Sequence, residues 1–539
     1  MAGRWSSGVP RPRSGGHNRL SRWTISLRVA GGGVVSLVLL LMASPARAIQ
    51  AQVPRQDRIG GWSEARQIPN YNDLLAAPFL VADQNHMVHA FNIELSGDQV
   101  YSVMYRRWSL AQGWSSPVDV LLPGYFGLAP SLGGVFLDHQ GMVHLVYFAG
   151  GQSGSSYYYS RAHVSEIDQA RAWSTPEPVA PDAGTIGTAA ITGNGEGELV
   201  IAYGGRLRGR GLYEVRSEDG GNTWSGPALV SPMRTQDLWP GAIWLEDGGD
   251  GQIFAVWDTV NSRGLREEVR YGRYDPALRG WTDIAVLAGV DSDQELLGAP
   301  SIIKNGNELI VFYQDDFPPT KFVRRSIDGG RTWSAPVRPF PHIGGYGYAF
   351  LVRDSAGTIH LVVGNRLPDP EIHGMWHSQL VGSQWLPLEP IISGPAGPSF
   401  DPSSPTAVIS QGNVLLATWS NNVRRESSTG AWYSYAILDA PELPVFVPPT
   451  LQPSEATASP GPSGTAATRQ SSEASTAAPA AIIDLEAGPT ASPNGPLFWG
   501  VFPVALLLLL MLIGRSARRP TPPQTKPSED LGGERDMPR

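Results

Sequence analysis

Short runs of alternating apolar and polar residues, separated by glycine-rich turns, fill the middle of this chain. Residues 130–180 show the unit: an apolar run at 130–137, a turn at 138–141, an alternating run at 142–148 and another run at 156–161. A turn that ends in tryptophan then opens a last run. Alternation with a period of two residues indicates half-buried strands, so each unit predicts four short strands.

Tryptophan marks the repeat of this unit. Seven tryptophans are spaced by 52, 59, 51, 57, 52 and 52 residues, and six of the seven precede serine or threonine: Trp62, Trp114, Trp173, Trp224, Trp281, Trp333 and Trp385. Four strands in a repeat of about 50 residues are typical of a β-propeller blade. The sequence therefore predicts an all-β fold with a single β-propeller over residues 49–442; two unrelated β-sandwiches are the alternative.

The number of units predicts how the ring closes. Six full units start near residues 77, 130, 188, 240, 300 and 348, and a seventh starts near 404 with only three strands, the last at 431–438. A strand around Trp62 precedes the first unit and can complete the seventh blade, so N- and C-terminal strands would close the ring together. We predict seven blades, with six or eight as alternatives if one repeat is divided wrongly.

Two tryptophan turns share a longer pattern, S-x-D-x-G-x-T-W. The residues of this pattern that we expect to be structural are Ser217, Asp219, Gly221, Trp224, Ser326, Asp328, Gly330 and Trp333. Serine and aspartate side chains can bond to backbone amides across such a turn, and glycine accepts a positive φ. We expect the tryptophan ring to fill the gap between the outer strands.

The pattern resembles the Asp-box, or bacterial neuraminidase repeat, of the sialidase-like propellers, and degenerate copies extend the resemblance over about residues 56–440. In sialidases these turns join the third and fourth strands, on the face opposite the substrate pocket. The resemblance implies a pocket in which three arginines hold a carboxylate, beside a tyrosine nucleophile assisted by glutamate and an aspartate acid/base. The expected face is built from two kinds of segment. Loops between second and third strands hold the candidate catalytic residues Arg206, Arg266, Glu267, Asp315 and Arg366, and connections between blades hold the candidates Tyr346 and Tyr348, together with Trp239.

Two features depart from the sialidase pattern and leave an enzymatic activity open. Sialidases have six blades, and this sequence predicts seven. Their first arginine lies in an Arg-Ile/Leu-Pro motif ahead of the boxes, whereas Arg66-Gln67-Ile68-Pro69 carries an insertion and Arg366-Leu367-Pro368 follows both boxes.

The ends of the chain predict export and a membrane anchor. Residues 1–48 combine a basic start, a short apolar run and Ala46-Arg47-Ala48, which is typical of a cleaved signal peptide; an uncleaved anchor is the alternative. Residues 443–496 are rich in Ala, Pro, Ser and Thr and predict a disordered stalk. Residues 497–514 carry no charge and predict a transmembrane helix, with a buried core helix as the alternative. Three arginines follow, so residues 515–539 would form a cytoplasmic tail.

Charge and cysteine content exclude several functions. The net charge of −8 hides a split, because residues 1–48 carry seven Arg and no acid, whereas residues 49–442 carry 27 basic and 41 acidic residues. An acidic propeller disfavours nucleic acid as a partner, although it permits a local basic pocket. The chain has no Cys, which excludes disulfides and thiolate metal sites. We expect no cofactor and no metal.

Together these patterns predict a cell-surface propeller on a stalk, with a single membrane span and the propeller outside. The first functional hypothesis is a module that binds an extracellular glycan or protein. The alternative is an exo-sialidase or related glycoside hydrolase, which requires three converging arginines. A weaker third hypothesis is an envelope assembly or sensor protein.

Overall fold

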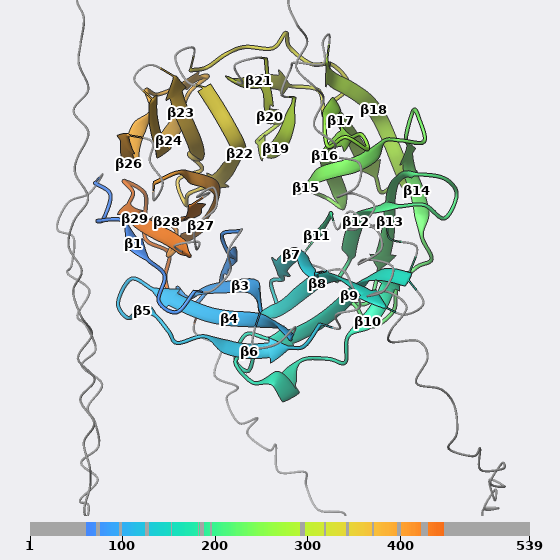
Figure 1. The fold of residues 1–539 in the computed structure, drawn as a ribbon, viewed down its shortest axis with the longest axis horizontal. Helices are drawn as coiled ribbons and strands as arrows, with labels where there is room; N and C mark the ends of the chain where they lie inside the picture. The colour runs from blue at the N-terminus through green and yellow to red at the C-terminus, as the bar shows by residue number, and fades with distance from the viewer. Residues whose placement is uncertain are drawn as a thin grey trace, which may run out of the picture. The chain divides into compact units, whose positions relative to one another are not determined.

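A computed structural model shows the propeller as a ring of seven blades (Figure 1). The structure describes residues 61–71, 76–95, 100–123, 129–151, 154–181, 183, 188–194, 197–290, 297–316, 320–340, 344–368, 371–395, 400–421 and 430–446. The predicted signal peptide, most of the stalk, the apolar run at 497–514 and the tail lie outside these residues. Within the described residues no helix is long and apolar enough to cross a membrane.

Each blade is an antiparallel sheet whose strands follow one another outward from the centre of the ring, as predicted, and one pairing between β21 and β22 joins the sheets of blades 5 and 6. Blade 1 comprises β2 (Phe79–Ala82), β3 (Val88–Leu95), β4 (Tyr101–Ser109), β5 (Gly113–Trp114) and β6 (Val118–Leu121). Blade 2 comprises β7 (Ser131–Leu137), β8 (Met142–Gly151), β9 (Gly154–His163) and β10 (Glu177–Ala180), with a short 3-10 helix, η1, at Ala170–Ala172. Blade 3 comprises β11 (Ala189–Gly193), β12 (Leu199–Gly205), β13 (Gly211–Ser217) and β14 (Ala228–Pro232).

The remaining blades follow the same order. Blade 4 comprises β15 (Trp239–Gly249), β16 (Gln252–Val260), β17 (Arg266–Asp275) and β18 (Gly280–Gly289). Blade 5 comprises β19 (Gly298–Asn305), β20 (Glu308–Asp315) and β21 (Thr320–Ser326). Blade 6 comprises β22 (Gly344–Arg353), β23 (Ile359–Pro368), β24 (Glu371–Val381), β25 (Gln384–Trp385) and β26 (Glu389–Pro395). Blade 7 comprises β27 (Pro402–Ser410), β28 (Val414–Asn421), β29 (Ala431–Ile437) and β1 (Arg66–Gln67).

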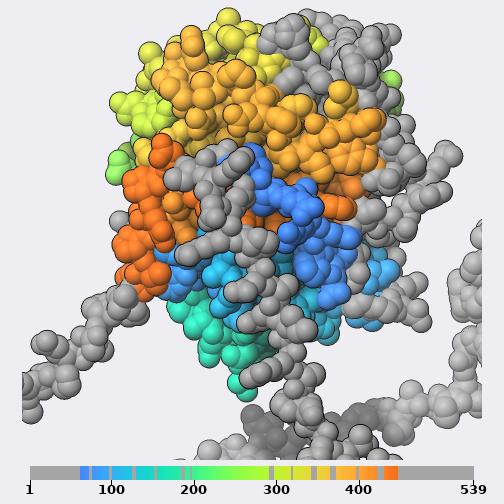
Figure 2. Space-filling view, turned by 90° about the vertical axis from the view of Figure 1, so that its left-hand side faces the viewer, coloured from blue at the N-terminus to red at the C-terminus, as the bar shows by residue number. Residues whose placement is uncertain are grey.

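The two ends of the propeller close the ring in blade 7, as the repeat count predicted. Strand β1 pairs antiparallel with β29, and Trp62 makes a further bridge to Ala436. Seen from the side, the dark blue N-terminal residues lie against the orange C-terminal residues (Figure 2). The fold and the number of blades predicted from the sequence are therefore confirmed.

The propeller has two unlike faces. On one, which we call the loop face, loops join the second and third strands of each blade and one blade connects to the next. On the other, the hairpin face, turns join the first strand to the second and the third to the fourth. The two S-x-D-x-G-x-T-W turns lie on the hairpin face, because they follow the third strands β13 and β21.

These two turns are held by the aspartate at their centre. Ser217 Oγ donates to Asp219 Oδ1 at 2.8 Å, and Thr223 Oγ1 donates to Asp219 Oδ2 at 2.7 Å. Asp328 accepts the equivalent bonds from Ser326 and Thr332. Since these bonds favour the charged form, they lower the pKa of both aspartates to about 2. The hydrogen bonds agree with the structural role expected for the turns.

Most of the repeated tryptophan rings contact an aromatic ring of the preceding blade. The expectation that a ring fills the gap between outer strands did not specify which blade would cover it. The edge-on or tilted pairs, with ring-centroid distances, are Trp62–His377 (5.4 Å), Trp114–Tyr433 (5.7 Å), Trp173–Phe91 (5.9 Å), Trp224–Tyr159 (4.8 Å), Trp333–Tyr271 (4.9 Å) and Trp385–Phe312 (5.1 Å). The repeated tryptophan is thus a wedge between blades. The hydrophobic cores of adjacent blades are continuous across these boundaries, as between blades 2 and 3 and between blades 4 and 5.

The last described segment, Pro441–Phe446, crosses the hairpin face, and we call it the strap. It bonds to first turns of blades 6, 7 and 1 in succession. The bonds are Ser355 Oγ to Pro441 O (2.5 Å), Leu443 N to Gln411 O (2.7 Å) and Phe446 N to Gln84 O (3.0 Å). The chain therefore leaves the propeller on the hairpin face, after bridging the seam where the ring closes.

Candidate functional site

Six of the seven candidate residues gather at the loop-face ends of blades 4, 5 and 6. Arg266 and Glu267 begin β17, and Asp315 ends β20. Tyr346 and Tyr348 lie in β22, and Arg366 lies in β23. Arg206 is the exception, since it is exposed in the loop after β12 in blade 3.

Several of these positions lie in strands, although the sequence placed them in loops. Arg366 was expected in a loop between strands and Tyr346 and Tyr348 in a connection between blades, yet all three lie in extended strands. The strands of blade 6 run farther toward the loop face than the alternation of apolar residues indicated. Trp239, also expected in a connection, is the first residue of β15.

One backbone ladder connects blades 5 and 6 at this end. Asp315 pairs with Thr320, Thr320 with Gly344, Gly344 with Arg366, and Arg366 with His373. Next to Gly344 the register of β22 against β23 shifts between Gly345 and Ala349, so Tyr346 and Tyr348 lie in an irregular stretch. Bulges of this kind re-aim side chains and are common beside binding and catalytic sites.

Asp258, at the loop-face end of β16, is the buried centre of the blade 4 part of the site. Its side chain is fully buried and accepts a hydrogen bond from Arg266 Nε at 2.7 Å. It also accepts the backbone N–H groups of Ala242 and Ala299, each at 2.9 Å, and so joins the first strands of blades 4 and 5. A Cβ on Gly241 would lie 1.9 Å from Asp258 Oδ1, which explains the glycine at that position.

These bonds fix Arg266 in place. Complete burial raises the pKa of the Asp258 carboxyl, while the guanidinium and the two amides favour the carboxylate and oppose that rise. The Arg266 side chain remains 38% exposed. A buried anchor on Nε therefore holds an arginine whose side chain still reaches solvent at the loop face.

Lys321, the second residue of β21, adds a buried amine at the loop-face end of blade 5. Its residue is 1% exposed, and burial lowers the pKa of its ammonium to about 7. Burial is the larger cause of this shift, and the positive charge of Arg266 is the second. A buried amine near a guanidinium is thus held toward its neutral form.

Two further arginines on the loop face, Arg210 and Arg234, each contact a partner of their own. Arg210 lies over the Trp239 ring at 4.3 Å, and Arg234 Nη2 donates to Glu267 Oε2 at 3.2 Å. Glu267 also accepts from Asn261 Nδ2 at 3.0 Å, so this candidate carboxylate belongs to a local network. Arg210 and Arg234 therefore have separate partners, an aromatic ring and a carboxylate.

Sequence reasoning missed Asp258 and gave Lys321 no role. The signal for Asp258 is a carboxylate that directly follows the apolar run Ile253–Trp257, where a strand residue is buried unless it pairs. Lys321 follows the loop of blade 5 and looks like a solvated lysine in the sequence. Neither metal-ligating clusters nor cofactor cradles were predicted, and the described residues hold no group of three or more His, Asp or Glu side chains suited to a metal.

Comparison with known proteins gives likeness in structure only. No protein-family model and no curated protein matches the chain. A polysaccharide lyase described as an ulvan lyase is 12% identical over 70% of this chain and 97% of its own, with a TM-score of 0.47. The NanB sialidase from Streptococcus pneumoniae is 10% identical over 70% of each chain, with a TM-score of 0.40. The endosialidase of phage phi92 is 10% identical over 72% of this chain and 70% of its own, with a TM-score of 0.40. The propeller expected from the sequence resemblance to sialidase-like proteins is the fold that the structure has.

Proposed function

We propose that this chain is a cell-surface propeller that binds an anionic extracellular glycan on the loop face of blades 4–6. The observation that carries the proposal is Arg266, which the buried Asp258 fixes from behind while 38% of its side chain stays exposed. A guanidinium held in one orientation suits a carboxylate or sulfate of a sugar, because planar bidentate bonding needs little further ordering.

The charges of the sector support an anionic ligand over a neutral one. Lys321 is buried, and the positive charge of Arg266 is among the causes that lower the pKa of its amine. A bound anion would favour the charged form of both groups. Ligand binding would therefore raise the pKa of Lys321 from about 7, and protons would be taken up at neutral pH.

The stalk, the membrane span at 497–514 and the external location remain parts of the proposal. They rest on the sequence patterns alone.

The test is a binding titration of the full chain with 3′-sialyllactose and with a glucuronic acid disaccharide, against lactose as the neutral control. The variant is the double substitution Asp258→Asn with Arg266→Gln, which removes the pair without leaving a buried charge alone. Arg279→Gln is the matched control, because Arg279 is an 81% exposed arginine on the hairpin face of the same blade. We expect the pair variant to weaken binding of an anionic sugar about tenfold or more and the control to leave it unchanged. No binding of either anionic sugar, or equal binding by the pair variant, would refute the proposal.

Hydrolysis of the same sugar is the second candidate, and the irregular stretch of β22 favours it. Tyr346 and Tyr348 lie in that stretch, at the same end of blade 6 as Arg366. If the site is a glycosidase, the full chain releases sialic acid from 3′-sialyllactose, and Tyr346→Phe or Tyr348→Phe abolishes release while binding persists. Binding without release, in the wild type, would leave the site a binding module.

A further inference from the structure

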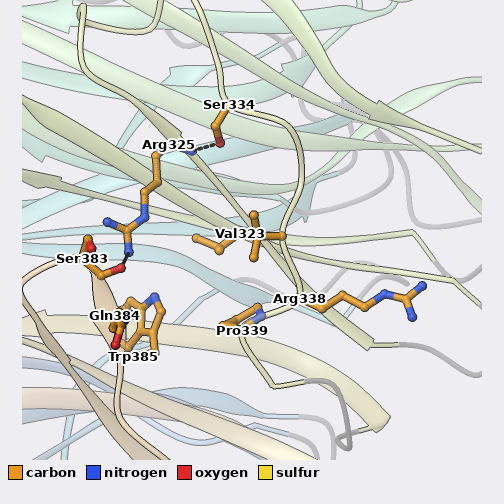
Figure 3. Close-up of a pocket in the computed structure, with 9 residues that line it drawn as sticks. Val323, Arg325, Ser334, Arg338, Pro339, Ser383, Gln384 and Trp385 are labelled. Carbon is orange, nitrogen blue, oxygen red and sulfur yellow. Dashed lines mark hydrogen bonds between the residues drawn. The ribbon is translucent and has the colours of Figure 1, made fainter.

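A cavity lies at the boundary between blades 5 and 6, toward the hairpin-face end of β21 (Figure 3). Its volume is about 390 Å³. We call it the rim pocket, and its walls are Val323, Arg325, Ser334, Val337, Arg338, Pro339, Ser383, Gln384 and Trp385. A cavity of this size is within the range that accommodates small organic ligands.

The sequence of blade 5 explains why the cavity exists. In the described residues its fourth strand is reduced to one bridge between Val323 and Val337, whereas blades 2, 3 and 4 have fourth strands of 4, 5 and 10 residues. Pro336 and Pro339 flank that bridge. Because proline has no N–H to donate, the segment with Pro336 and Pro339 pairs with β21 only at Val337. The cavity lies beside this segment, next to the turn of blade 6 that holds Ser383 and Gln384.

The walls of the rim pocket are of two kinds. Arg325, Ser383 and Gln384 lie together on one side with the Trp385 ring, while Val323 and Pro339 face them (Figure 3). Arg338 points away from this group and pairs with Asp316. The pocket therefore offers an apolar surface and a row of hydrogen-bonding groups at once.

The charge of the pocket is compensated. Arg325 Nη2 donates to Ser383 O at 2.8 Å, and Nη1 donates to Glu308 Oε1 at 3.2 Å. The guanidinium is thus oriented by its neighbours and neutralised by a carboxylate outside the pocket. Such a site has no surplus charge with which to attract an anion.

We infer that the rim pocket binds a neutral pyranose of a glycan. A pyranose has an apolar C–H face and an edge of hydroxyl groups, which match the two kinds of wall. The C–H face would lie on Trp385 and Val337, and the hydroxyls would reach Gln384 and Ser334. This site is separate from the anionic site of the loop face, so the two could hold different sugars of one glycan.

The experiment is saturation-transfer NMR on the full chain with methyl glycosides of glucose, galactose and mannose as probes. Trp385 is a wedge between blades, so the pocket is better blocked by Gln384→Trp, at an exposed position on its wall. Gln112→Trp is the matched control, since Gln112 is an exposed glutamine in the equivalent turn of blade 1, before Trp114. We expect saturation transfer to at least one glycoside, reduced about tenfold by Gln384→Trp and unchanged by Gln112→Trp.

The other outcomes separate this site from its alternatives. Absence of saturation transfer to all three glycosides, or equal transfer in Gln384→Trp, overturns the inference. Loss of transfer in the Asp258→Asn and Arg266→Gln double variant assigns the sugar to the loop face instead, and also overturns it. Because the loop-face titration uses anionic sugars, either site can fail while the other stands.

Discussion

Replacing Gly330 with alanine tests whether the tryptophan turns join neighbouring blades. Gly330 lies in the turn of blade 5 with φ +86°, and a Cβ there would lie 2.1 Å from Cζ and Oη of Tyr271 in blade 4. Tyr271 packs edge-on against Trp333 and donates its hydroxyl to Gly329 O at 3.0 Å. Gly329 has φ +72°, but its Cβ would meet no atom within 4 Å. Two adjacent glycines thus share a backbone region and differ in their contact with the preceding blade.

The expected difference follows from these contacts. Alanine in the left-handed region costs about 1–2 kcal/mol at either position. At Gly330 the Tyr271 ring must also move, which adds about 1–3 kcal/mol for overpacking. Loss of the tyrosine hydrogen bond adds about 1 kcal/mol. Gly330→Ala should therefore lower the free energy of unfolding by about 2–4 kcal/mol more than Gly329→Ala.

Urea unfolding followed by tryptophan fluorescence measures both variants. The same pair made in a Tyr271→Ala background completes a double-mutant cycle, and there the extra effect at Gly330 should vanish because the space is open. Equal destabilisation by the two glycine variants in the wild-type background would refute the inter-blade role of the turn. So would an extra effect at Gly330 that persists without the tyrosine ring.

Three further predictions concern buried charged or titratable groups. Arg106 donates to Glu94 at 2.7 Å and both are nearly fully buried, so Arg106→Ala should lower the free energy of unfolding by about 3–5 kcal/mol in urea unfolding, and an effect below 1 kcal/mol would contradict this. Lys321 has a pKa of about 7 in the folded protein, against an ordinary value of 10.5. Between these values the unfolded state binds more protons, so the free energy of unfolding rises with pH. Lys321→Met should remove this slope in a pH series of melting temperatures. Burial and the neighbouring His360 lower the pKa of His377 to about 3, so the free energy of unfolding falls as the pH drops below 6.5. His377→Gln should flatten that fall, and an unchanged acid profile would contradict the role of the His360–His377 pair.

The fold could be predicted because the repeat carries the same physical signals seven times. The spacing of tryptophans gave the blades, and the unmatched strand near Trp62 gave the closure that pairs β1 with β29. Even the serine after the tryptophan has a repeated role, since Ser225 N and Ser334 N donate to the carbonyls of Arg216 and Arg325 on the third strands. Such contacts lie within one repeat, so they leave a local pattern in the sequence.

The packing of the tryptophan rings could not be predicted in the same way. The ring of Trp333 contacts Tyr271, which lies one whole repeat earlier in the chain. Local alternation fixes which face of a strand is buried, but it does not say which blade covers that face.

The candidate site was predicted in part for the same reason. The positions of Arg266, Asp315 and Arg366 toward the loop face follow from the order of strands within each blade, and all three lie at the loop-face ends of blades 4, 5 and 6. Their meeting depends on the pairing of Thr320 with Gly344, a single contact between blades 5 and 6. Asp258 depends on a contact of the same kind, because it bonds to Ala299 in the next blade.

Charge gives the strongest constraint on what the sector can bind. The propeller carries 41 acidic and 27 basic residues over 49–442, so an anionic sugar meets repulsion at a distance. Salt screens that repulsion over a Debye length of about 8–10 Å, while the contact with a partly buried guanidinium is screened much less. Binding through Arg266 should thus survive physiological salt, unlike binding of a polyanion to a basic surface, which weakens steeply. On the proposed function, an acidic propeller that holds Arg266 on the buried Asp258 carboxylate is suited to bind a single acidic sugar at short range. Its overall negative charge makes it poorly suited to bind long polyanions.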